Sequence, residues 1–395
     1  MGKVRTHKSV AIVPFWRDIR VLRILAQLAF LMVVIAILLW AISNYRARGL
    51  IFGYSFLSKE ASFDLAEGIP FKPTDSYARA FLVGVVNTVR VAVIGIILAT
   101  LLGLVTGIAR LSRNWLLRKI ATVYIEIIRN TPLLVQLFFL YFAVIMKLPR
   151  LSRAIVLAGP VYISNRGVVI PWLRLAESFR LWWPFLLLAA AWAGVLIVIR
   201  RRTIRRVGRP GINLLWVFSC LIAVPVLGWL LIPGNPLRFD LPDLVTRSGG
   251  VITVDGGVTL SSEFTAILTG LVIYTAAFIA EVVRAGIQSV PKGQAEAARA
   301  QGFTNRQILR LIVLPQALRV IIPPLISQYL NLTKNSSLAI AIGFLDLYAV
   351  SQTMLNQSGR VVEVFLMIMG SYLAISLTIS LIMNIINKRI QIVER

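Results

Sequence analysis

Long apolar blocks dominate this chain and constrain its fold more than any other feature. A helix that crosses the hydrocarbon core of a membrane needs about 20 mostly apolar residues. The chain is 58% hydrophobic over 395 residues, with a mean hydropathy of +0.81, which exceeds the apolar content of ordinary globular domains. We therefore predict an all-α integral membrane protein with about eight transmembrane helices, over residues 24–42, 91–109, 124–146, 181–199, 212–232, 264–284, 319–345 and 362–386.

The distribution of basic residues predicts how these helices are oriented. Cationic loops resist translocation and collect in the cytoplasm. With a cytoplasmic N-terminus, most of the 42 Lys and Arg residues fall in cytoplasmic segments, including the basic run 200–206, and eight spans return the C-terminus to the same side. The net charge of +26 therefore reflects membrane topology, and we expect no nucleic-acid partner.

The N-terminal segment and the rare residue types narrow the function. The first apolar block is longer than the core of a secretory signal, so we interpret it as a retained helix, although Ala41-Ile42-Ser43 leaves cleavage open. Cys220 and His7 are the only residues of their types, so the sequence offers neither a disulfide framework nor a metal site. We predict no catalytic residues and no cofactor on this chain.

Glycine and proline mark special backbone in three places. Gly103 and Gly107 form a G-x-x-x-G that permits close helix approach, a pattern common by chance. Pro323-Pro324 and Gly343 interrupt the seventh apolar block and predict a broken, pathway-lining helix there. In the last of three long outer segments (43–80, 147–180 and 233–263), alternating runs around Asp-Gly predict a β-hairpin over 250–260. These outer segments are either docking sites for an outer partner or plain connectors.

A polar segment between the sixth and seventh spans, here called the elbow (residues 285–318), carries the most informative pattern. We expect Pro291 in the first turn of one helix, Gly302 at its left-handed end, and Thr304 with Gln307 as the capping box of a second helix that Pro315 terminates. The elbow follows E-A-A-x3-G-x9-I-x-L-P at Glu296, Ala297, Ala298, Gly302, Ile312, Leu314 and Pro315.

Two other interpretations of the elbow have to be weighed. Two helices with glycine at the turn also resemble a DNA-binding helix-turn-helix. Spans on both sides, however, would obstruct entry into a major groove, so we reject that reading. A plain connecting loop is the stronger alternative, and the full pattern argues against it.

Three ordered motifs carry a resemblance to a known family. The elbow pattern is similar to the E-A-A signature of ABC-importer permease subunits. The stretch Ile128–Phe142 (IRNTPLLVQLFFLYF) and the stretch Asn331–Leu338 (NLTKNSSL) resemble conserved stretches of the polar amino-acid (HisM/HisQ-like) branch. The resemblance covers about 81–146 and 264–390. The chain is longer than compact members and is similar to the long Q-type subunit of general L-amino-acid permeases or glutamate/glutamine/aspartate/asparagine importers.

The resemblance implies an architecture. A type I ABC-importer permease core would comprise residues 81–146 and 264–395. Residues 1–80 would add a cytoplasmic N-terminus, an extra helix and a periplasmic loop, and residues 147–263 would be an insertion bearing two further spans and periplasmic loops. The protein would be multi-pass in a bacterial inner membrane.

The resemblance also implies partners and a mechanism. A second permease subunit, a homodimeric ATP-binding subunit and a periplasmic amino-acid-binding protein would complete an importer of polar L-amino acids. The chain lacks G-x-x-x-x-G-K-[ST], so ATP and Mg would bind on the partner ATPase. The seven pattern residues of the elbow would couple to that ATPase. An ion-coupled secondary transporter is the rival function, and it would need neither an ATPase nor an elbow.

Polar side chains inside the spans are candidates for the substrate pathway. Glu126 and Arg129, three residues apart, can pair on one helix face, so an ion pair competes with substrate contact. Helix–helix hydrogen bonding competes equally for the second group. The candidates are Glu126, Arg129, Thr131, Lys334, Asn335, Ser336 and Ser337.

Overall fold

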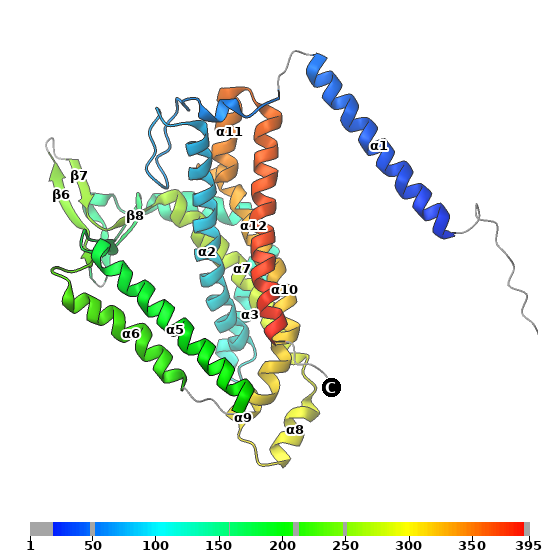
Figure 1. Ribbon diagram of the computed structural model, residues 1–395, viewed down its shortest axis with the longest axis vertical. Helices are drawn as coiled ribbons and strands as arrows, with labels where there is room; N and C mark the ends of the chain where they lie inside the picture. The colour runs from blue at the N-terminus through cyan, green and yellow to red at the C-terminus, as the bar shows by residue number, and fades with distance from the viewer. Residues whose placement is uncertain (1–18, 48–51, 158, 208–212, 248–250, 391–395) are drawn as a thin grey trace, which may run out of the picture.

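The computed structural model describes residues 19–47, 52–157, 159–207, 213–247 and 251–390. Figure 1 shows a central helical bundle, a separate helical hairpin beside it with small sheets at one end, and a first helix lying apart. The chain is mostly helical, as predicted. The bundle positions the elbow at one end, and a compact cap covers the other (Figure 1).

Five described helices are long and apolar enough to cross a membrane. A sixth candidate is a pair, α3 (Trp115–Asn130) and a helix over Leu133–Lys147 that begins with α4 (Leu133–Phe138), bent by 107°. The five are α2 (Tyr77–Arg110), α5 (Phe179–Val207), α7 (Ser262–Gln288), the run Asn305–Ile342 that contains α10 (Leu314–Asn335), and α12 (Val361–Ile390).

The predicted count of eight spans is not confirmed. Helix occupies most of the described part of each predicted block, but the apolar stretches of α1 (Ile19–Ala47) and α6 (Leu214–Leu231) are shorter, over Val21–Ile37 and Leu215–Leu231. At 1.5 Å per residue, such stretches fall short of a hydrocarbon core about 30 Å thick. The described residues therefore contain five candidate spans, or six with the bent pair.

The bundle is built on a close contact between α2 and α7. A Cβ atom added at Gly103 would lie 2.7 Å from Ile279 Cβ, and one added at Gly107 would lie 2.8 Å from the Ala280 carbonyl oxygen. Real Cβ atoms essentially never approach so closely, so only glycine fits at either position. The G-x-x-x-G that looked weak in the sequence is thus the packing surface of the two most extensively paired helices.

Apolar packing and side-chain hydrogen bonds together close the end of the bundle opposite the elbow. There α11 (Leu347–Ser358) packs against α2, and buried Phe56, from the segment before α2, joins the same core. The Asn87 amide donates to the Glu67 carbonyl at 3.2 Å and to the Leu345 carbonyl at 2.8 Å. These bonds tie the loop, α2 and the start of α11 together. Burial raises the pKa of the Glu67 carboxyl, although Arg90 lies 4.0 Å away.

The seventh apolar block does not break where its prolines stand. Pro323 and Pro324 lie inside α10, which continues to Asn335. The chain then passes through a 3₁₀ segment, Ser336–Ile342, which Gly343 ends in the left-handed region at φ +82°. Both prolines are exposed, and the helix continues past them although each lacks a backbone N–H donor. The prediction of an interruption was correct at Gly343 and wrong at the proline pair.

Small antiparallel sheets, which the sequence analysis did not predict beyond one hairpin, occupy the outer segments. One sheet has the order β1-β2-β3-β8, and the other two are the pairs β4–β5 and β6–β7. The strands are β1 (Ile155–Leu157), β2 (Val161–Ser164), β3 (Gly167–Ile170), β4 (Trp172–Leu175), β5 (Leu237–Asp240), β6 (Asp243–Arg247), β7 (Val251–Asp255) and β8 (Val258–Ser261).

The predicted hairpin over 250–260 is wrong in its pairing. Strands β7 and β8 flank Gly256-Gly257, as expected, but β7 pairs with β6 and β8 pairs with β3. Gly257 donates its N–H to Asp240 Oδ2 at 3.0 Å, which directs the chain away from a tight return. Residue 250 lies outside the described residues.

Candidate functional site: the elbow and the membrane pathway

The elbow forms the two-helix turn that the sequence predicted. Helix α8 (Lys292–Ala300) is followed by a turn at Gly302, whose φ of +82° lies in the left-handed region. The N–H of Gly302 donates to the Arg299 carbonyl at 2.9 Å, and that of Phe303 donates to the Ala298 carbonyl at 3.1 Å. These bonds satisfy the last carbonyls of α8. Pro291 lies one residue earlier than predicted, because it caps α8 instead of joining its first turn.

A complete capping box starts the second half of the elbow. The N–H of Thr304 donates to Gln307 Oε1 at 2.8 Å, and the N–H of Gln307 donates to Thr304 Oγ1 at 3.4 Å. Short helix α9 (Asn305–Ile308) then runs through a π-helical turn, Leu309–Val313, into α10. The expectation that Pro315 ends the second helix was wrong, since the helical run continues past Pro315, which closely follows the π-helical turn.

Replacement of Thr304 by alanine tests this cap. We expect Thr304→Ala to destabilise the elbow by about 1 kcal/mol, because the Gln307 N–H loses its acceptor. Hydrogen exchange of the amides in 304–308 measures the change, and Thr304→Ser should restore protection. Equal exchange in the alanine variant would show that the capping bond does not hold the turn.

The pattern residues of the elbow differ in accessibility. Glu296, Ala297 and Gly302 are exposed and free to meet a partner surface. Ala298 is only 4% exposed, like Ile308, so its small side chain lets the two halves of the elbow pack. Leu314 is exposed, whereas Ile312 and Pro315 are half-buried at the junction with α10. A role for these residues in coupling stays a prediction.

An ionic cluster that was not predicted from the sequence holds the end of α7, from which the elbow begins. Glu281, in the last turns of α7, accepts from Arg110 at the end of α2 and from Arg284 one turn further along α7. Arg284 also donates to Gln288, the last residue of α7. The i, i+3 spacing of Glu281 and Arg284 was a visible signal. The cluster ties the helix that leads into the elbow to its main neighbour in the bundle.

The candidates at the bend between α3 and α4 form no ion pair. Glu126 and Arg129 are both exposed, and among the described residues no ion pair joins them. The Arg129 guanidinium instead lies 5.3 Å from the centre of the Phe278 ring. Thr131 accepts a hydrogen bond from the Gln136 amide at 2.6 Å and so braces the bend. Of the two alternatives for Glu126 and Arg129, the ion pair does not form among the described residues, and substrate contact stays a prediction.

The candidates at the end of α10 include two serine hydroxyls that donate hydrogen bonds to the backbone and one exposed lysine. Ser336 is buried and donates to the Thr333 carbonyl at 2.8 Å, and Ser337 donates to the Lys334 carbonyl at 2.8 Å. Lys334 is exposed and Asn335 half-buried. Helix α4 packs against the 3₁₀ segment, so the fold brings these residues near the Thr131–Gln136 brace. The described residues contain no group of three His, Cys, Asp or Glu side chains that could hold a metal ion.

The apolar helices, with the two-helix elbow between two of them, define a multi-span membrane protein. The chain belongs to the family described as binding-protein-dependent transport system inner membrane component, whose model matches residues 187–392.

Three relatives match nearly the whole chain. It is 44% identical to the putative amino-acid ABC transporter permease protein YhdX of Escherichia coli, over 94% of each chain. It is 44% identical to the general L-amino acid transport system permease protein AapQ of Rhizobium johnstonii, over 87% of this chain and 84% of that one. It is 38% identical to the glutamate/glutamine/aspartate/asparagine transport system permease protein BztB of Rhodobacter capsulatus, over 96% of each.

Proposed function

We propose that this chain is the permease subunit of an ATP-driven importer that moves polar L-amino acids from periplasm to cytoplasm. The observation that carries the proposal is the capped elbow between α7 and α10, in a chain without a phosphate-binding loop. Such a chain can receive motion from an ATPase but not generate it. The three relatives are all named as amino-acid permeases, which supports the substrate class.

The elbow would act as a lever between two membrane helices. A partner ATPase that binds ATP and Mg would close around the exposed residues Glu296, Ala297 and Gly302. Movement of α8 would reach α7 directly and α10 through the continuous helical run that starts at Asn305. The Glu281 cluster would carry the displacement of α7 to α2. The spans would then rock between inward- and outward-facing states, with both termini in the cytoplasm.

The complete importer would contain three kinds of partner. A second permease subunit would pair with this chain and complete the pathway. A homodimeric ATP-binding subunit would hold the two elbows, and a periplasmic amino-acid-binding protein would deliver substrate to the outer face. The candidates Thr131, Lys334 and Asn335 would lie along the pathway, where Lys334 could attract a substrate carboxylate.

Purification tests the proposed assembly. The chain is isolated by an affinity tag after expression together with its neighbouring transport genes, and we expect an ATP-binding subunit and a second permease to co-purify in fixed ratio. ATP hydrolysis by the complex should rise when binding protein and a polar amino acid are added. A chain that purifies alone under conditions that preserve membrane complexes would contradict the proposal.

A further inference from the structure

The inserted helices α5 and α6 carry an apolar pocket beside the membrane. The two helices pack closely, because a Cβ added at Gly228 would lie 2.5 Å from Cγ of Phe185. Helix α5 is long enough to cross a membrane, and α6 runs along it (Figure 1). A pocket of about 400 Å³ opens on α6 and is lined by Trp182, Leu221, Ile222, Pro225, Val226, Trp229 and Leu230.

Aromatic side chains mark the end of this hairpin as a membrane interface. Trp182 packs edge-on against Trp229 at 5.6 Å between ring centres and contacts Phe179 at 5.8 Å. The Trp182 indole N–H donates to the Pro225 carbonyl at 2.8 Å, which fixes the ring over the pocket. Tryptophan gathers where hydrocarbon meets water. The apolar pocket therefore lies on the hydrocarbon side of an aromatic belt.

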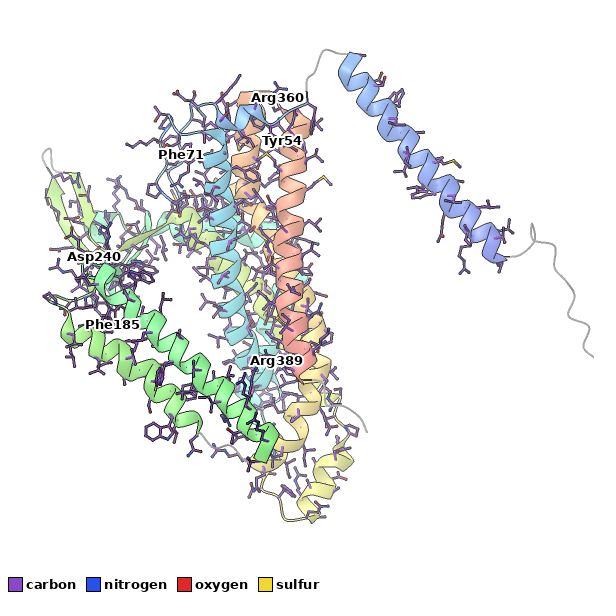
Figure 2. All side chains as sticks on the ribbon, in the orientation of Figure 1. Tyr54, Phe71, Phe185, Asp240, Arg360 and Arg389 are labelled. Carbon is purple, nitrogen blue, oxygen red and sulfur yellow. The ribbon has the colours of Figure 1, made fainter. Side chains whose placement is uncertain are left out.

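A second pocket, lined by both apolar and polar side chains, lies next to the apolar one. Its volume is about 530 Å³, and its lining is Leu173, Trp229, Asn235, Leu237, Arg238 and Phe239. Trp229 lines both pockets, so the two are neighbours. Figure 2 shows Asp240, at the end of β5, at the same end of the hairpin as Phe185. The combined site is apolar on one side and cationic on the other.

One arginine beside the second pocket, Arg238, has no ion-pair partner among the described residues. Arg174 and Arg238 are direct partners across β4 and β5, an arrangement that like charges destabilise. Asp240 pairs with Arg174 at 2.7 Å and also accepts the Gly257 N–H. Arg238 is exposed and forms no ion pair with any described residue. An anion that binds here would neutralise the Arg238 guanidinium, to which the described residues supply no ion-pair partner.

We propose that this site binds one phospholipid with an anionic headgroup. An acyl chain fills the apolar pocket, the glycerol region passes Trp229, and the phosphate accepts hydrogen bonds from Arg238 and Asn235. The planar guanidinium matches a phosphate in two-point geometry. A carboxylate of a docking protein would satisfy Arg238 but leave the apolar pocket on α6 empty. A lipid satisfies both pockets, and this is why we favour it.

Lipid retention by the intact complex tests this site. The purified transport complex is delipidated in detergent, mixed with equal amounts of phosphatidylglycerol and phosphatidylcholine, and examined by native mass spectrometry. We expect the wild type to retain one phosphatidylglycerol per copy of this chain in preference to phosphatidylcholine. Arg238→Gln should reduce the preference about fivefold, the effect of one cationic side chain near a membrane surface. The matched control is Arg247→Gln, on the separate pair β6–β7, which should keep the preference.

A second variant reports on the apolar pocket. Val226→Trp places a large ring in it and should reduce retention of both lipids, because the acyl chain loses its space. Equal retention of the two lipids by the wild type would overturn the proposal, as would unchanged preference in Arg238→Gln. Loss of binding-protein affinity in Arg238→Gln, with no lipid retained by the wild type, would assign the site to a protein carboxylate instead.

Discussion

Gly302→Trp is expected to abolish ATP-driven uptake while the protein stays in the membrane. Gly302 adopts φ +82°, and a non-glycine residue in this region costs about 1–2 kcal/mol. No atom lies within 4 Å of the position where its side chain would begin, so an indole would project from the elbow without disturbing the fold. It would instead block the surface that we assign to the ATPase. We expect uptake to fall at least tenfold, measured with labelled amino acid in proteoliposomes.

Two matched variants separate backbone strain from bulk. Gly302→Asn keeps a residue that tolerates the left-handed region and adds only a short side chain, so we expect most uptake to remain. Thr304→Ala loosens the elbow without adding volume and should have an intermediate effect. Full uptake by Gly302→Trp, with normal amounts of complex, would show that the elbow does not contact the ATPase.

Gly107→Leu is expected to prevent stable packing of the bundle. The new Cβ would lie 2.8 Å from the backbone carbonyl of Ala280, and backbone cannot turn aside as a side chain can. Overpacking of this kind costs about 3 kcal/mol. The contact joins α2 and α7, so their separation would also break the bond between Arg110 and Glu281. We expect a large loss of monodisperse protein in fluorescence-detected size-exclusion chromatography.

The control for this substitution is Gly370→Leu in α12. No atom lies within 4 Å of a Cβ at Gly370, so the same change in volume meets open space. We expect this variant to elute like the wild type. Equal loss in both variants would show that leucine is harmful at any helical glycine, and that the contact between α2 and α7 is not special.

The helices and the local shape of the elbow were readable from the sequence because short-range physics determines them. Apolar length located the long helices but missed α11, and the capping box at Thr304 and Gln307 was predicted to the residue. The stop at Gly302 follows from the same local logic, since glycine alone adopts positive φ without strain. Pro315 was misread because a proline ordinarily ends a helix, whereas this helical run continues past it.

Features that depend on distant residues could not be read in the same way. The exposed Arg129 contacts the ring of Phe278, which lies on another helix, and forms no ion pair with Glu126 among the described residues. The Asp-Gly-Gly turn predicted a hairpin between its two flanking strands. Strand pairing, however, depends on which strand edges are available in the fold, and β8 pairs with β3. The importance of Gly103 and Gly107 likewise emerged only from the neighbouring helix.

The most direct test of the account is uptake by the complex in proteoliposomes of defined composition, assayed with a panel of acidic, amide and basic L-amino acids. We expect uptake that requires ATP inside, the ATP-binding subunit and the binding protein outside, and that is unaffected when ion gradients are collapsed. Uptake by this chain alone, driven by an ion gradient and insensitive to ATP, would contradict it and establish a secondary transporter.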